Sequence, residues 1–306
     1  MISDAHCHFL SEGFFAALAH QRGRGEAGTD LTRELGWEAP GPAERLADRW
    51  VRELDAHGVS RAALIASVPR DEALVAEAVA HHPTRLVGFF MVDPSAADAV
   101  ERTHRGLSEL GLRAVCLFPA MHQVRLDDPR VYRILEATSS HPGAAVFVHC
   151  GMLSVGARQK LGLPSRFDLR LGQPLEVQPL AMAYPHVPFI VPHFGAGFFR
   201  EALMAAEACA NIHLDTSSSN RWIRYTPGLT LDGVFRTAIE VLGSSRLLFG
   251  TDSSFFPRGW QKAVYEQQKA VLDALQIAAG DQAAIFGGNF DRLLASGPDG
   301  NHDPVP

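Results

Sequence analysis

Lysine is scarce in this chain of 306 residues, and its scarcity limits the chemistry that the chain can perform. Only three of the 28 basic residues are lysines, namely Lys160, Lys262 and Lys269. None of them lies in an apolar, strand-like run, so catalysis through a Schiff base on a buried strand is excluded.

The chain also lacks the features of several large protein classes. Its four cysteines form no CxxC pair, which indicates free thiols in a reducing compartment rather than a disulfide framework. No apolar run approaches the roughly 18 residues that a membrane-spanning helix needs. The first residues do not combine a basic segment with an apolar one, as an export signal would. We therefore expect a cytoplasmic protein without a membrane partner.

Charge and glycine patterns exclude further partners. The net charge is −6 and no basic block is interleaved with aromatic residues, which argues against nucleic-acid binding. The chain has no phosphate-binding loop, no dinucleotide fingerprint and no Gly-x-Ser-x-Gly elbow. Small molecules are the expected partners, and a homodimer is the candidate assembly.

Apolar runs define the expected fold. Hydrophobic residues make up 46% of the chain and charged residues 20%, as in globular proteins. Eight short runs read as buried parallel strands, at residues 1–8, 61–67, 86–92, 112–118, 144–150, 187–193, 210–216 and 246–252. Segments with helical spacing follow them, at 42–57, 70–82, 95–110, 127–140, 173–184, 197–209, 230–243 and 260–278.

This eightfold alternation predicts an α/β protein with a (β/α)8 TIM barrel, and a doubly wound open sheet is the main competitor. We expect a single domain over residues 1–295. The polar tail, residues 296–306, is expected to be disordered.

Three connections are too long for simple turns: residues 9–41, 151–172 and 217–229. All three follow the carboxyl end of a predicted strand, where barrel enzymes build their active sites. The polar, Gly-rich residues 20–30 are expected to form a mobile flap rather than core structure.

Candidate metal ligands stand at strand ends. His6 and His8 close the first strand, and because side chains alternate along a strand, both point to one side and Cys7 to the other. His149, His193 and Asp252 lie at the ends of the fifth, sixth and eighth runs. In a barrel these ends converge on one pocket, and such a set suits zinc or a similar divalent ion. Unrelated strand-end histidines are the competing interpretation.

The fourth strand bears on the number of metal ions. Two-metal barrel sites commonly use a bridging lysine or glutamate there, and residues 112–119 contain neither. We therefore expect one divalent ion per chain, zinc or alternatively manganese. Cys116 is expected to be core. Asp215 ends the seventh strand and either orients a group at the site or belongs to the core.

The ligand order resembles that of the amidohydrolase superfamily. The segments VFVHCG, FIVPHFGAG, NIHLDTS, RLLFGTDS and IFGGNFDRLL are similar to the branch that contains aminocarboxymuconate-semialdehyde decarboxylase, γ-resorcylate decarboxylase and related lactone or amide hydrolases. The resemblance implies one divalent metal, usually zinc, held by His6, His8, His149 and Asp252. It also implies that His193 activates water or relays a proton. The chain departs from this branch after the eighth strand, where Pro257 follows the aspartate later than usual.

We predict a mononuclear metal-dependent hydrolase, with Asp252 and His193 as catalytic residues, that acts on a small carboxylated cyclic or aromatic substrate. The alternatives are a non-oxidative decarboxylase that uses the same site and a metal-binding protein without turnover. Candidate substrate-binding residues are Arg221, Trp222, Arg224 and Arg258, with Trp260 as a further rim residue. For these arginines, exposure to solvent is the competing interpretation.

Overall fold

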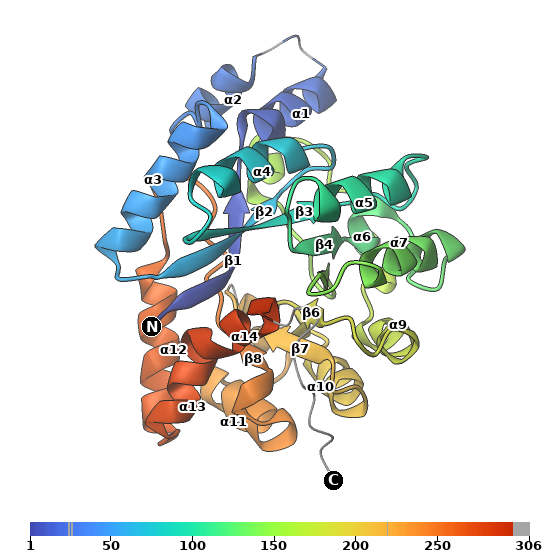
Figure 1. Ribbon diagram of the computed structural model, residues 1–306. Coiled ribbons are helices and arrows are strands. Elements are labelled where there is room, and N and C mark those ends of the chain that lie inside the picture. Colours follow the sequence, from blue (N-terminus) through green and yellow to red (C-terminus); the bar gives the residue numbers. More distant parts are fainter. Residues whose placement is uncertain (24, 26, 219, 296–306) are drawn as a thin grey trace.

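Eight parallel strands form the centre of the molecule (Figure 1). The computed structural model describes residues 1–23, 25, 27–218 and 220–295. The strands are β1 (Ser3–Phe9), β2 (Arg61–Ala66), β3 (Leu86–Met91), β4 (Ala114–Leu117), β5 (Ala145–Val148), β6 (Phe189–Val191), β7 (Ile212–Asp215) and β8 (Leu247–Leu248). Each strand pairs with the next one in sequence, as the eight apolar runs predict.

Hydrogen bonds beyond the end of β8 bring the last strand back to the first. The backbone N–H of Ala5 donates to the carbonyl of Phe249 over 2.8 Å, and that of His8 donates to the carbonyl of Ser253 over 2.7 Å. In the opposite direction, the N–H of Asp252 donates to the carbonyl of His6 over 2.9 Å. The sheet is therefore a barrel rather than a doubly wound open sheet.

Helices surround the barrel (Figure 1). The α-helices are α1 (Glu12–Arg22), α2 (Gly28–Leu35), α3 (Ala43–Ala56), α4 (Glu72–His81), α5 (Ala99–Ser108), α6 (Pro119–His122), α7 (Pro129–Ser139), α8 (Gly156–Lys160), α9 (Val177–Ala183), α10 (Phe199–Ala208), α11 (Leu231–Leu242), α12 (Lys262–Ala274), α13 (Ala279–Ala283) and α14 (Asn289–Ala295). Shorter helical turns are η1 (Leu169–Leu171), η2 (Pro174–Glu176), η3 (His193–Gly195), η4 (Asn220–Tyr225), η5 (Ser244–Arg246) and η6 (Ala284–Gly288). The predicted (β/α)8 fold is confirmed.

The alternation of side chains along the strands divides the core into two layers. Along β2, Leu64 packs outward against the helices, whereas Ala63 and Ile65 face the barrel interior. The helix α14 adds Phe290 to the interior layer, and its Leu294 carbonyl accepts a hydrogen bond from Arg113, just before β4. The helix α14 thus covers the amino-terminal end of the barrel. The carboxyl ends of the strands are the expected place for a site.

The long connection at residues 9–41 contains two helices that the sequence analysis does not place. These are α1 and α2, and the buried side chains of Phe14, Leu18 and Leu31 form a cluster with Leu161 of the segment after β5. These helices were missed because the polar stretch HQRGRGEAGTD separates two short groups of apolar residues with helical spacing.

Some predictions reach past the described part of the chain. Residues 24 and 26 of the expected flap lie outside the described residues, and so does the expected tail at 296–306. No helix in the described residues is long and apolar enough to cross a lipid bilayer.

Candidate metal centre

The end of β1 brings two imidazoles together. His6 and His8 lie on the same side of the strand, with their Nε2 atoms 3.4 Å apart, and Cys7 is buried on the other side. His6 is almost fully shielded from solvent, whereas His8 lines a cavity at the barrel mouth. The alternation that the sequence predicts therefore produces a pair of nitrogen atoms on a rigid strand.

Asp252 completes a group of three possible ligands. Its Oδ1 atom lies 3.0 Å from His8 Nε2 and 3.7 Å from His6 Nε2. One ligand atom from each residue lies within 4.8 Å of the others. Asp252 has a backbone φ of 58°, in the left-handed region that non-glycine residues rarely adopt. The residue is thus held in a strained conformation, as functional residues often are.

Hydrogen bonds on the far sides of the two imidazoles determine which nitrogens carry protons. Ser67 donates its hydroxyl proton to the Ile65 carbonyl over 3.0 Å, so it can only accept from His8 Nδ1, which lies 2.9 Å away. His6 Nδ1 donates to the Asp215 carboxylate over 2.6 Å. Both Nε2 atoms therefore present lone pairs toward Asp252.

Two lone pairs 3.4 Å apart that face a carboxylate oxygen repel one another unless a cation lies among them. A proton on an imidazole or a metal ion can supply this positive charge. Two imidazoles and one carboxylate form a donor set that zinc accepts, and the second hydrogen bond on each imidazole is typical of metal-bound histidine. The residues present thus fit a divalent metal.

Gly250 and Ser217 set the position of His6. The Ser217 hydroxyl lies 3.0 Å from His6 Nδ1, and the Ser217 N–H donates to Asp215 over 2.5 Å. A Cβ atom on Gly250 would lie 2.8 Å from the Cβ of His6 and 2.9 Å from that of Ser217. The chain after β8 can approach β1 this closely only because residue 250 has no side chain.

His149 and His193 lie beside this group. The His193 ring centroid is 4.9 Å from that of His6 and 5.3 Å from that of His149. His149 stacks on Phe118, and its Nδ1 atom is buried with no hydrogen-bond partner among the described residues. His193, like Asp252, has a positive φ, of 55°.

The electrostatic environment keeps these two imidazoles neutral. Burial lowers the pKa of His149 well below its ordinary value, and the neighbouring His193 and His6 lower it further. Burial and the nearby His6 likewise lower the pKa of His193. The neutral form of histidine is the one that binds metals and accepts protons.

The charges of Asp252 and His6 respond to their partners. Burial would raise the pKa of Asp252, but the adjacent imidazoles of His8, His6 and His193 hold it below its ordinary value. Burial would lower the pKa of His6, but the Asp215 carboxylate raises it. Asp252 is therefore a carboxylate at neutral pH, available as a ligand or as a base.

Two adjoining cavities open above the group. The first, the metal cavity, has a volume of about 260 Å³ and is lined by His8, Asp252, Lys160 and Arg258 among others. The second, the Arg221 cavity, has a volume of about 310 Å³. The two share four lining residues, which are His149, Ser154, His193 and Asp252. Two of the candidate ligands, His149 and Asp252, therefore lie where the two cavities meet.

The four candidate substrate-binding residues are divided between these cavities. Arg221, Trp222 and Arg224 line the Arg221 cavity, and Arg258 lines the metal cavity. Trp222 is buried, and its indole Nε1 has no partner in the described part of the chain. The Arg258 guanidinium lies 4.6 Å from the centre of the Phe255 ring.

Trp260 is not a rim residue. It is 3% exposed, and its indole N–H donates to the buried carboxylate of Asp4 over 2.7 Å. The same carboxylate accepts from the hydroxyl of Thr251 over 2.5 Å. Trp260 therefore helps to fix the position of the chain beside Asp252 through the contact with Asp4 that Trp260 and Thr251 share. The prediction was wrong because neither the aromatic ring nor its neighbours reveal that the chain turns inward there.

The supporting residues carried weaker signals in the sequence. The sequence leaves Asp215 open between orienting a bound water or substrate group and a core or supporting role, and in the structure Asp215 supports His6. Ser67 and Ser217 were missed, although each lies just beyond the end of a strand, β2 or β7. Serine is common in turns, so only the placement of strand ends around one pocket could have indicated them.

The comparison with known proteins agrees with this architecture. The sequence pattern of one family, described as Amidohydrolase, matches residues 3–295. The chain belongs to this amidohydrolase family. A curated relative, Protein fluG of Emericella nidulans, is 25% identical over 170 residues, which are 54% of this chain. The match spans only 18% of that much longer protein.

Solved structures of the same fold include decarboxylases and hydrolases. The 5-carboxyvanillate decarboxylase LigW of Sphingomonas paucimobilis has a TM-score of 0.66 at 18% identity, over 96% of this chain and 99% of that one. A probable 2-pyrone-4,6-dicarboxylic acid hydrolase of Acinetobacter baumannii has a TM-score of 0.61 at 14% identity, over 96% and 99%. An amidohydrolase of Burkholderia multivorans, solved with bound zinc, has a TM-score of 0.62 at 14% identity, over 97% and 99%.

Proposed function

We propose that this member of the amidohydrolase family is a mononuclear metal-dependent hydrolase that acts on a small carboxylated cyclic or aromatic substrate. The convergence of two imidazole lone pairs and a carboxylate at the barrel mouth carries the proposal. Mere chelation would not need His193 beside the ligands, which argues against a metal-binding protein without turnover.

The ligands in this proposal are His6, His8, Asp252 and His149, whose buried Nδ1 atom has no partner in the described residues. Zinc suits them best, and manganese is the alternative. A divalent ion held by these residues would lower the pKa of water and polarise a substrate oxygen. The strand β4 offers neither lysine nor glutamate as a bridging ligand, which supports a single ion.

Asp252 and His193 move the protons in this proposal. The Asp252 carboxylate accepts the proton of the attacking water. His193 Nδ1 lies 3.2 Å from the Ser217 carbonyl and 2.9 Å from the Ser217 hydroxyl. The carbonyl supports the tautomer with a proton on Nδ1, and the hydroxyl supports the tautomer with a proton on Nε2. His193 can therefore accept a proton, or donate one to the leaving group, without moving its ring.

The cavities suit a ring that carries an acid. Phe14, Trp37 and Phe118 line the metal cavity, and the Trp37 ring stacks on Phe255 with 4.0 Å between the centroids. Four cationic side chains line the two cavities: Lys160, Arg221, Arg224 and Arg258. In the described part of the chain none of the four forms an ion pair with a carboxylate. Their charges are available for an anionic substrate.

Decarboxylation by the same residues is the second candidate. The apolar side chains of Met91, Met121 and Leu153 line the metal cavity, and an apolar wall disfavours a carboxylate relative to the uncharged CO₂ that replaces it. The similarity in fold to the 5-carboxyvanillate decarboxylase supports this candidate, and the similarity to the pyrone dicarboxylic acid hydrolase supports the first.

A substrate panel distinguishes the two candidates. Zinc and manganese forms of the protein are assayed with lactones, amides and hydroxybenzoates in water labelled with oxygen-18. Ring opening or acyl cleavage with uptake of the label supports the hydrolase. Release of CO₂ from a carboxylated ring, with no label in the remaining organic product, replaces it with the decarboxylase. Turnover of neutral substrates alone contradicts the proposal of an anionic substrate.

A further inference from the structure

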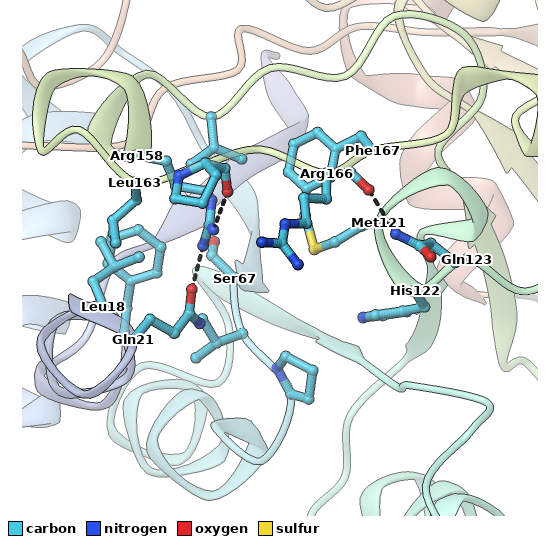
Figure 2. Close-up of a pocket in the computed structure, with 15 residues that line it drawn as sticks. Leu18, Gln21, Ser67, Met121, His122, Gln123, Arg158, Leu163, Arg166 and Phe167 are labelled. Carbon is cyan, nitrogen blue, oxygen red and sulfur yellow. Dashed lines mark hydrogen bonds between the residues drawn. The ribbon is translucent and has the colours of Figure 1, made fainter. Parts of the chain in front are cut away.

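A third cavity adjoins the metal cavity and takes no part in the chemistry proposed above. This Arg166 cavity has a volume of about 480 Å³ and lies among α1, the chain after β2, α6 and the segment that follows α8 (Figure 2). Four residues line both it and the metal cavity: Phe14, Ser67, Met121 and Val155. Ser67 is also the residue that accepts the hydrogen bond from His8. A molecule in one cavity thus touches side chains that form the wall of the other.

Among the described residues that line the Arg166 cavity, two are cationic and none is acidic. The cationic residues are Arg158 and Arg166. Arg158 donates to the side-chain oxygen of Gln21 and to the Pro164 carbonyl, both neutral acceptors. Its Nε atom is buried and has no partner in the described residues.

Arg166 has the more available of the two guanidinium groups. In the described residues its side chain makes no hydrogen bond or ion pair, and in Figure 2 it projects into the space between Arg158 and His122. The Gln123 side chain donates to the Arg166 backbone carbonyl over 2.7 Å, which holds the segment in place. In contrast, Arg170 on the same segment is paired with Asp168 over 2.6 Å.

The His122 side chain forms an uncharged part of the lining of the Arg166 cavity. Both of its ring nitrogens are buried without a partner among the described residues, and burial lowers its pKa. The imidazole is therefore uncharged at neutral pH, and the two arginines supply the charge of the cavity. Guanidinium groups bind carboxylates through charge-assisted hydrogen bonds.

We propose that the Arg166 cavity binds a second acidic group of the substrate, on an arm that reaches past Met121 from a ring seated in the metal cavity. This inference rests on the proposed function, because it places the reacting ring in the metal cavity. It restricts the substrate to cyclic acids with a second carboxylate on a flexible chain. Arg166 acts here as a specificity residue and takes no part in the bond-breaking step.

Two matched compounds test the proposal by calorimetric titration of the zinc-loaded protein. Para-(carboxypropyl)benzoate carries the second acid, and para-butylbenzoate has a similar length without it. We expect the diacid to bind about tenfold more tightly, as one charge-assisted hydrogen bond provides. Arg166→Met removes this preference and leaves the affinity for para-butylbenzoate unchanged. Arg166→Lys restores part of the preference. Arg170→Met, on the same segment, retains it in full.

The outcomes separate this inference from the proposed function. Equal affinity of the wild-type protein for both compounds overturns the inference, and so does a preference that survives in Arg166→Met. Benzoate reports on the metal cavity by itself, and its binding is expected to be lost in His8→Ala. Absence of benzoate binding alongside an Arg166-dependent preference for the diacid contradicts the proposed function alone. Absence of binding by all three compounds overturns both.

Discussion

The Nδ1 atom of His6 donates a hydrogen bond to the carboxylate of Asp215 over 2.6 Å, and both side chains are shielded from solvent. This contact assigns the proton of His6 to the side away from the barrel mouth. The opposite nitrogen then faces His8 and Asp252 with a free lone pair. Asp215 thus acts on the candidate metal site through the orientation and tautomer of His6, without reaching the site itself.

Replacing Asp215 with asparagine should weaken metal binding. The amide removes the charge that holds the imidazole proton, and we expect the zinc affinity to fall about 10- to 100-fold. Competition with a chelator measures this affinity. Asp48→Asn, which alters a half-buried aspartate on α3, is the control and should leave the affinity of the barrel-mouth site unchanged. An unchanged affinity in Asp215→Asn would contradict the role assigned to Asp215.

Much of this arrangement follows from the sequence, and the residues that do not follow share a physical cause. His6, His8, His149, His193 and Asp252 could be placed because each lies at or near the end of an apolar run, and parallel strand ends meet at one face of a barrel. Ser67 and Ser217 could not, because their roles depend on which way a turn directs a hydroxyl.

The strand β8 is shorter than the eighth apolar run. It spans only Leu247–Leu248, since the following residues pair with β1 through the bridge between Cys7 and Ser253.

The buried cluster under α1 and α2 shows the opposite case. Its apolar residues are present in the sequence, but the polar residues around the junction of α1 and α2 obscure the helical spacing on either side. Whether a polar stretch separates two short helices or forms one long loop depends on packing partners elsewhere in the chain, here Leu161 and Leu163.

Gly250→Ala should damage the metal site while leaving the rest of the fold intact. The added methyl group would lie 2.8 Å from the Cβ of His6 and 3.1 Å from an Asp215 carboxylate oxygen, so the chain after β8 must move away from β1. We expect loss of tightly bound metal and a destabilisation of about 1–3 kcal/mol. Gly280→Ala is the matched control, because nothing lies within 4 Å of its added methyl group. Full metal content in Gly250→Ala would show that this close approach is unimportant.

His213 should make the protein sensitive to acid. Burial, and then the charges of Arg246 and Arg292, lower the pKa of His213 from 6.5 to about 3. Between these values the unfolded chain binds more protons than the folded chain, so this contribution to stability is complete above pH 6.5 and is lost as the pH falls toward 3.

Urea unfolding at about pH 7.5 and about pH 5 tests this expectation. The free energy of unfolding of His213→Asn should fall by about 2 kcal/mol less over this range than that of the wild-type protein. His186→Asn, at an exposed histidine, should follow the wild-type protein. Parallel losses in His213→Asn and the wild-type protein would contradict the prediction.

Substitutions of the ligands should separate metal binding from turnover. His8→Ala removes a nitrogen ligand, so we expect both metal content and activity to be lost. Asp252→Asn keeps an oxygen ligand but cannot accept a proton, so some metal should remain without turnover. Elemental analysis and a steady-state assay measure the two properties. Activity in Asp252→Asn close to that of the wild-type protein would exclude Asp252 as the base.

A second group on the surface provides the control for these metal measurements. Asp48, His81 and His82 also place three possible ligand atoms within 4.8 Å, but His81 is exposed and Asp48 and His82 are only half-buried. His82→Ala should leave activity unchanged. A fall in activity in that variant would show that metal outside the barrel mouth contributes to turnover.

Anomalous diffraction at the zinc absorption edge tests the central claim most directly, on crystals of the protein reconstituted with zinc. The account predicts one strong peak at the barrel mouth, within bonding distance of His6 Nε2, His8 Nε2 and an Asp252 oxygen. The absence of a peak there, or two peaks of equal strength within the barrel mouth, would contradict a mononuclear metal centre.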